Sequence, residues 1–189
     1  MTLAYSTPSR WTETVLADFD HFLLDHAAAE KKAAGMAISM ASHYPDKPAL
    51  VEAMADLAVE EMSHYREVVK IIHGRGGRTA ADQRDAYVNA LRKHLNKSSE
   101  AYFLDRLLLG GVIEARGAER FGLIAEALEG GPLKQFYRSI SRSEERHLSL
   151  FTDLARRYFP EARVEQRLRE WLALEAEIIA RQPLRAALH

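Results

Sequence analysis

The chain contains no cysteine among its 189 residues. This absence excludes disulfide frameworks, cysteine nucleophiles, zinc knuckles and iron–sulfur clusters held by thiolates. No apolar run approaches the roughly 20 residues that a transmembrane helix needs, and the start of the chain, Met1–Ser6, has neither of the patterns typical of a targeting segment. We therefore expect a cytoplasmic protein with no membrane association.

An excess of charge of one sign is also missing. The chain has 26 basic and 27 acidic residues, which gives a net charge of -1. A domain that binds nucleic acid without regard to sequence would have a pI above about 9, so this class of protein is not favoured. A chain of this length buries roughly 70% of its unfolded surface, and we expect one domain over residues 1–189.

Glycine and proline are scarce, with ten and six residues, and they cluster at four places. The clusters are Tyr44–Pro48, Gly74–Gly77, Gly130–Pro132 and Pro160. The segments between them are rich in Ala, Leu, Glu and Arg, contain few β-branched residues and show no alternating runs. This pattern predicts helices separated by turns.

Four long helices are predicted over residues 16–44, 50–71, 103–128 and 133–158. In each, apolar or small residues recur at steps of three and four, which places them in one stripe along the helix. Such stripes are typical of helices that pack lengthwise at a shallow angle. We predict an all-α four-helix bundle whose long crossover contains a short helix over 82–95, followed by a C-terminal helix over 164–179.

Titratable residues interrupt every apolar stripe. They are Glu30 in the first helix, Glu61 and His64 in the second, Glu114 in the third, and Glu144 and His147 in the fourth. Burying a lone carboxylate costs several kcal/mol, so four carboxylates in one core need compensation. The pattern Glu-x-x-His is common by chance, but its two side chains share one helix face, and here both pairs lie on the apolar stripe.

The spacing of these residues around the turns is an independent indication that they lie at one level. Glu30 and Glu61 are equidistant from the turn Tyr44–Pro48, and Glu114 and Glu144 are equidistant from position 129, beside Gly130. In an antiparallel helix pair, residues equidistant from the turn lie at the same height. Each hairpin is therefore expected to bring one Glu and one Glu-x-x-His together.

Four carboxylates and two imidazoles in a bundle core are the ligand set of di-iron and di-manganese carboxylate proteins. Two divalent cations offset the four negative charges, and mixed oxygen and nitrogen ligation suits iron or manganese. The alternative, buried ion pairs with Lys or Arg, is not favoured because the stripes contain no cations. The sequence therefore predicts a two-metal site held by Glu30, Glu61, His64, Glu114, Glu144 and His147.

Other polar residues near these positions have less specific interpretations. His26, one turn before Glu30, either lines the metal cavity or is a hydrogen-bonded buried histidine. Glu60 is better interpreted as a solvated carboxylate than as an acceptor for a ligand imidazole. Glu119 is expected to form surface ion pairs with Arg116 and Arg120. The mid-helix pair Gly110-Gly111 indicates a local bulge or room for a ligand.

The layout resembles the ferritin-like superfamily and, more closely, the bacterial MiaE family of tRNA hydroxylases, over nearly the whole chain. The stretches that show the resemblance are His26 with Glu30–Ala34, Tyr44–Asp46, Glu60-Glu61 with His64-Tyr65, Arg75-Gly76, Asp105–Leu108, Ile113–Arg116 with Glu119–Phe121, and Ser143-Glu144 with Arg146-His147. The ligand spacing is shared by the whole superfamily, whereas the residues flanking the ligands are more specific.

The resemblance implies a monooxygenase that uses O2 and external electrons. Its substrate would be 2-methylthio-N6-isopentenyladenosine beside the tRNA anticodon, hydroxylated on the isopentenyl group. It further implies that the six ligands hold two iron ions and that an external electron donor is needed, since no flavin or nicotinamide fingerprint is present. We expect the protein to be a monomer or a dimer.

A tRNA partner would be contacted through surface cations, and the sequence offers three groups of candidates. They are Arg75 and Arg78 after the second helix, Arg92-Lys93 with Lys97 in the crossover, and Arg138, Arg142 and Arg146 on the fourth helix. Two alternative functions remain open. One is ferritin- or rubrerythrin-like iron oxidation or peroxide reduction with the same ligands, and the other is a metal-free helical scaffold or binding bundle.

Overall fold

The computed structural model describes residues 2–189, and this part of the chain is helical with no strands. The helices are α1 (Ser9–Ala17), α2 (Phe19–His43), α3 (Pro48–Gly74), α4 (Ala86–Arg92), α5 (Ser99–Ala127), α6 (Pro132–Tyr158) and α7 (Glu161–Ala180). They form two compact units. Across residues 2–189, none of the helices combines the length and the apolar character needed to cross a membrane.

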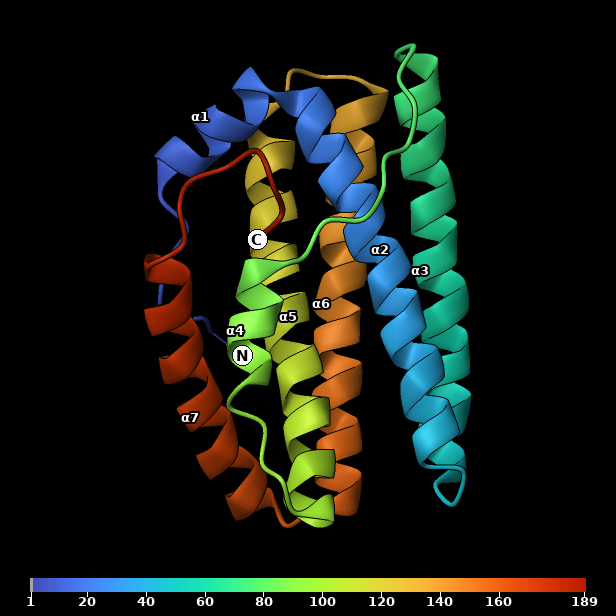
Figure 1. Cartoon of the computed structure of the whole chain (residues 1–189), viewed down its shortest axis with the longest axis vertical. Coiled ribbons are helices and arrows are strands. Elements are labelled where there is room, and N and C mark those ends of the chain that lie inside the picture. Colours follow the sequence, from blue (N-terminus) through green and yellow to red (C-terminus); the bar gives the residue numbers. More distant parts are fainter. Residues whose placement is uncertain (1) are drawn as a thin grey trace. The chain divides into compact units, whose positions relative to one another are not determined.

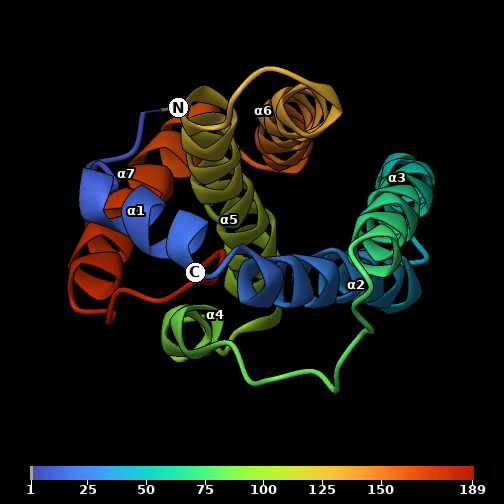
Figure 2. The same cartoon turned by 90° about the horizontal axis from the view of Figure 1, so that it is seen from above.

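The α2–α3 unit comprises Glu13–Arg84 and Leu184–Leu188. Its two long helices form an antiparallel hairpin, visible in Figures 1 and 2. Their facing stripes contain the buried apolar side chains Leu23, Ala34, Ala37, Met40, Leu50, Met54 and Leu57. The turn between them ends at Pro48, the first residue of α3, where the missing N–H of proline costs no helical hydrogen bond.

The α5–α6 unit comprises the residues up to Thr12, Asp85–Pro183 and His189. Its long helices α5 and α6 are antiparallel, α7 packs on both of them, and the short α4 packs on α7 (Figure 1). Gly131, in the turn before α6, has φ +135°, a left-handed conformation that residues with a side chain rarely adopt. The unit boundaries fall within α1 and before α4.

The predictions of an all-helical chain and of four long helices are confirmed, with differences at two places. The first predicted helix, 16–44, is divided at Asp18, whose carboxylate accepts a hydrogen bond from the His21 N–H and so begins α2. The short helix predicted over 82–95 is limited to α4, because the Asp85 side chain caps its start by accepting from the Val88 N–H at 2.9 Å. The prediction of a single domain over residues 1–189 stays a prediction.

The pair Gly110-Gly111 lies within an unbroken stretch of α5, so the local bulge, one of the two alternatives for this pair, is absent. A Cβ atom added to Gly110 would lie 2.9 Å from the ring of Phe151 on α6, closer than real contacts allow. At Gly111 the nearest atom, Cβ of Phe151, would lie at 3.4 Å, an ordinary contact. Gly110 therefore gives the Phe151 ring the space to pack against the α5 backbone.

Candidate metal centre

Within the α2–α3 unit, the structure brings Glu30, Glu61 and His64 together. The carboxylate Oε2 atoms of Glu30 and Glu61 lie 3.4 and 3.8 Å from the Nδ1 atom of His64. One donor atom from each residue can be chosen so that all lie within 4.8 Å of one another. This cluster, which we call the first triad, has the size and donor chemistry of a cation site.

Within the α5–α6 unit, Glu114, Glu144 and His147 form an equivalent cluster, the second triad. The Nδ1 atom of His147 lies 3.7 Å from a carboxylate oxygen of Glu114 and 3.8 Å from one of Glu144. The donor atoms of this cluster also lie within 4.8 Å of one another. The expectation that each hairpin brings one Glu and one Glu-x-x-His to a common level is therefore met in both units.

Five of the six ligand candidates are almost fully removed from solvent, and the side chain of the sixth, His64, is 14% exposed. The four carboxylates and His147 are at most 5% exposed. Burial raises the pKa of Glu30, against the opposing effect of hydrogen bonds to His26 and His64. Burial lowers the pKa of His64, but hydrogen bonding and charge attraction from Glu30 and Glu61 outweigh it and raise this pKa to about 9. The first triad therefore favours a positive charge at its imidazole, which a bound cation would replace.

His26 extends the first triad by one turn of α2. Its Nε2 atom lies 2.7 Å from Oε1 of Glu30, and its side chain is fully buried. The interpretation of His26 as a hydrogen-bonded buried histidine is thus confirmed. Since this bond uses only one carboxylate oxygen of Glu30, it orients the group while leaving Oε2 beside His64. Glu60 is more remote, with its carboxylate 3.8 Å from Nε2 of His64.

The expected ion pair of Glu119 with Arg116 forms, but its expected surface location is wrong, because the side chains of Arg116 and Arg120 are buried. Arg116 donates two hydrogen bonds to the carboxylate of Glu175 on α7, at 2.8 and 2.9 Å, and a further one to Glu119. Tyr87 of α4 donates to the same Glu175 carboxylate at 3.1 Å. This buried polar network lies one half-turn along α5 from Glu114 and ties α5 to α4 and α7.

The N-terminal segment completes this network. The backbone N–H and the hydroxyl of Thr7 donate to the Glu119 carboxylate at 2.9 and 2.7 Å, and Arg116 donates to the carbonyl of Tyr5 at 2.8 Å. Arg120 stacks on the ring of Trp11, with 4.6 Å to its centroid. Reasoning from the sequence missed the role of Glu175, although its position one turn after Trp171, on the buried face of α7, is a signal of the kind that identified the ligands.

The sequence predicts that all six ligand candidates meet at one centre. The structure brings three of them together in each unit, and the meeting of the two triads stays a prediction. The candidate tRNA contacts Arg75 and Arg78 lie in the α2–α3 unit, and the other two groups lie in the α5–α6 unit. Of these, Arg75 pairs with Asp20 and Arg138 with Glu126.

Comparison with known proteins shows relatives along the whole chain. A protein-family profile described as tRNA-(MS[2]IO[6]A)-hydroxylase (MiaE) matches residues 1–189. A tRNA 2-(methylsulfanyl)-N(6)-isopentenyladenosine(37) hydroxylase from Pseudomonas putida is 33% identical over 177 residues, which are 94% of this chain and 86% of that protein. The hydroxylase of the same name from Salmonella typhimurium is 30% identical over 130 residues, 69% of this chain and 47% of that protein.

The fold also has a counterpart among solved structures. A Synechococcus protein described as having aldehyde deformylating oxygenase activity superposes with a TM-score of 0.93 and 32% sequence identity. The superposition covers 99% of this chain and 94% of that protein. An oxygenase therefore shares the helical, ferritin-like fold.

Proposed function

The chain belongs to the MiaE family of tRNA hydroxylases, and from this premise we propose that it hydroxylates the isopentenyl group of 2-methylthio-N6-isopentenyladenosine beside the tRNA anticodon. The reaction would use O2 and electrons from an external donor. One observation supports this proposal most strongly: in each unit a buried Glu lies beside a Glu-x-x-His pair. In a chain of this family, these residues are the donor set expected of an oxygen-activating metal centre.

The six residues of the two triads would together hold two iron ions. Carboxylate oxygens with imidazole nitrogens fit iron, and a cysteine-free chain offers no thiolate ligands. Two divalent cations would offset the charge of Glu30, Glu61, Glu114 and Glu144 and replace the proton that the first triad favours at His64. When bound, iron supplies the ability to react with O2, which amino-acid side chains lack.

The protein's own residues would prepare this centre in three ways. His26 holds the Glu30 carboxylate in a fixed orientation through the 2.7 Å hydrogen bond. The buried network of Arg116 and Glu175 fixes the register of α5, from which Glu114 projects. Burial of the carboxylates keeps bulk water away from their oxygen atoms, which favours selective oxidation of the substrate over side reactions.

The substrate would be a nucleotide displaced from the stack of the anticodon loop. Proteins that modify a base or its substituents take the nucleotide out of its stack to reach the reacting atom, and single-stranded loops allow this at low cost. We also propose that the protein acts in the cytoplasm, where its tRNA substrate would be found, as a monomer or a dimer.

The test supplies iron-loaded protein with a chemical reductant, O2 and tRNA that carries the unhydroxylated nucleoside. After digestion, mass spectrometry is expected to show the hydroxylated nucleoside. The Glu144→Ala variant should form none, because the second triad loses a ligand. Glu145→Ala is the matched control, since Glu145 is the neighbouring glutamate and is exposed. Absence of product with the wild-type protein, beside a working positive control, would refute the proposal.

A further inference from the structure

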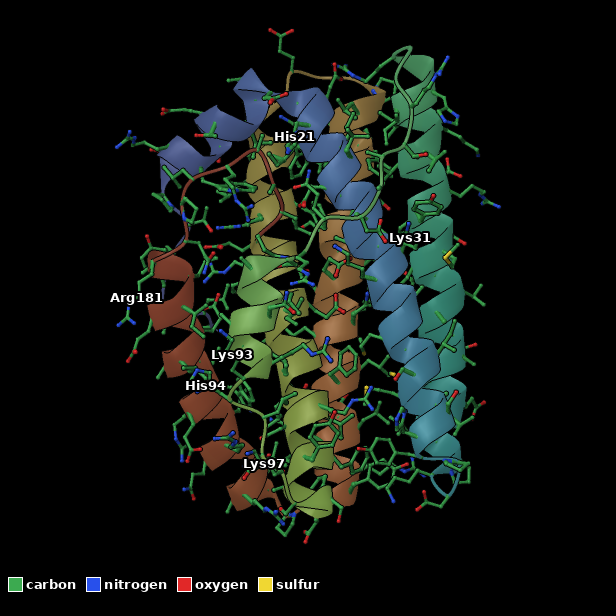
Figure 3. The ribbon with its side chains drawn as sticks, in the orientation of Figure 1. His21, Lys31, Lys93, His94, Lys97 and Arg181 are labelled. Atoms are coloured by element: carbon green, nitrogen blue, oxygen red, sulfur yellow. The ribbon has the colours of Figure 1, made fainter. Side chains whose placement is uncertain are left out.

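The end of α4 and the connection to α5 concentrate positively charged side chains. The last residue of α4 and the first five of this connection, residues 92–97, read Arg-Lys-His-Leu-Asn-Lys. Arg92, Lys93 and Lys97 are exposed, and among residues 2–189 no carboxylate forms an ion pair with them. Figure 3 shows Lys93, His94 and Lys97 along this connection. We call residues 92–97 the basic segment.

A buried carboxylate fixes the backbone of the basic segment. The side chain of Asp105, on α5, is 1% exposed and accepts a hydrogen bond from the Asn96 N–H at 2.7 Å. The same carboxylate accepts from Arg167 of α7 at 2.6 and 3.0 Å, and Arg167 also donates to the carbonyl of His94 at 3.4 Å. The backbone is thus held at two positions while the cationic side chains stay in solvent.

Asp105 accepts a further hydrogen bond and keeps its negative charge. The indole N–H of Trp171 donates to its Oδ1 atom at 3.1 Å. Burial would raise the pKa of Asp105, but its hydrogen bonds from Arg167, the Asn96 N–H and Trp171 outweigh burial and lower it, so the group stays ionised at neutral pH. Asp105 lies in one of the stretches that resemble the MiaE family, yet it belongs to neither triad. Its hydrogen bonds identify what it does in this chain.

We infer that the basic segment contacts the phosphate backbone of the tRNA substrate at a distance from the modified nucleotide, with Asp105 as its positioning residue. This inference rests on the proposed function. Exposed cations without carboxylate partners are available to phosphates, and an anchored backbone reduces the conformational entropy lost on binding. Contacts of this kind position a nucleic acid and do not read its sequence.

The distance along α5 indicates which part of the tRNA the segment contacts. From Ser99, at the start of α5, to Glu114 is 15 residues, or about 22 Å at 1.5 Å per residue. A duplex rises about 3.4 Å along its axis for each phosphate of one strand, so a stem that lies along α5 would place roughly six phosphates over this length. We take the stem to lie along α5; a nucleotide at the level of the second triad would then leave the adjoining stem, and not the loop itself, within reach of Lys93 and Lys97.

The first experiment measures binding of tRNA by fluorescence anisotropy over a range of salt concentrations. It compares the wild-type protein with Lys93→Ala/Lys97→Ala and with the control Arg66→Ala/Lys70→Ala, whose exposed cations are paired with Glu67. The test variant should lose roughly 5- to 20-fold in affinity at low salt, and its slope of log K against log[salt] should become shallower by about 1.5. A single-stranded oligonucleotide of the anticodon loop should bind both variants as it binds the wild type.

A second variant tests the positioning role of Asp105. Asp105→Asn should make the salt slope with tRNA shallower while the binding of the isolated loop oligonucleotide stays unchanged. If it lowers only the thermal midpoint and leaves the salt slope at the wild-type value, Asp105 is structural and its positioning role is refuted.

The outcomes separate this inference from the proposed function. If wild-type protein hydroxylates tRNA and Lys93→Ala/Lys97→Ala keeps the wild-type affinity and salt slope, the inference is overturned and the proposed function stands. If that variant binds tRNA normally but turns over slowly with a protein electron donor, the segment binds the donor, and the inference is again overturned. Wild-type protein that binds tRNA through this segment without hydroxylating it would instead refute the proposed function.

Discussion

The guanidinium of Arg116 and the carboxylate of Glu175 form a bidentate ion pair, with Nε–Oε1 and Nη2–Oε2 distances of 2.8 and 2.9 Å, and neither side chain is exposed. The pair joins α5 to α7, which are 59 residues apart at these positions. Two further groups share it, because Tyr87 donates to Glu175 and Glu119 accepts from Arg116. The helix that contributes Glu114 is thereby held in register by polar contacts as well as by its apolar core.

Removing one partner of this pair should be strongly destabilising. Glu175→Ala leaves the Arg116 charge buried with less compensation, and we expect the free energy of unfolding to fall by about 3–5 kcal/mol. Urea unfolding of the metal-free protein measures this change. The control is Glu126→Ala, which removes a partner from the more exposed pair with Arg138 and should cost less than about 1 kcal/mol. Equal effects of the two variants would show that the buried pair contributes no more than a surface pair.

The neighbouring glycines of α5 should respond differently to alanine. Gly110→Ala places a Cβ atom 2.9 Å from the buried Phe151 ring, and the resulting overpacking costs about 1–3 kcal/mol. Gly111→Ala makes only an ordinary contact, so the better helix propensity of alanine should leave it neutral or up to about 1 kcal/mol more stable. Thermal denaturation of the two variants gives the comparison. A Gly110→Ala variant as stable as Gly111→Ala would contradict the close approach of α6.

Metal affinity should rise with pH. In the metal-free protein the pKa of His64 is raised from 6.5 to about 9. Protonation of His64 therefore stabilises the folded protein fully below pH 6.5, and this stabilisation is lost as the pH rises through about 9. A metal ion must displace this proton, and binding should therefore strengthen between about pH 7 and pH 9. Anaerobic calorimetry with ferrous iron, in buffers of different ionisation enthalpy, would measure the protons released. Affinity that is flat over this range, with no proton release, would contradict the role of His64.

Most of the helical architecture could be predicted from the sequence because it depends on local patterns. The three-and-four spacing of apolar residues identified the long helices, and the glycine and proline clusters identified their turns. The content of each triad was predictable for the same reason, since two residues equidistant from a tight turn must lie at one level. Glu61 therefore lies at the level of Glu30, and Glu144 at the level of Glu114.

The sequence was less informative where a contact joins distant segments. Arg116 looked like a surface residue because its acidic neighbour Glu119 lies one turn away on the same helix. The partner that explains its burial, Glu175, lies in the C-terminal helix, and no local rule connects the two positions. The same holds for Asp105, whose carboxylate accepts hydrogen bonds from Arg167 and Trp171 of α7, 62 and 66 residues further along the chain.

We propose that six residues, three from each unit, hold two iron ions for the hydroxylation of tRNA, and the iron content of the variants tests this proposal. After anaerobic loading and removal of excess metal, the wild-type protein should retain about two ions per chain. Glu61→Ala and Glu144→Ala should each retain fewer, while Glu145→Ala should match the wild type. Uptake well below one ion per chain, unchanged by Glu61→Ala or Glu144→Ala, would contradict the account and favour a metal-free bundle, and uptake of many ions per chain would favour iron storage.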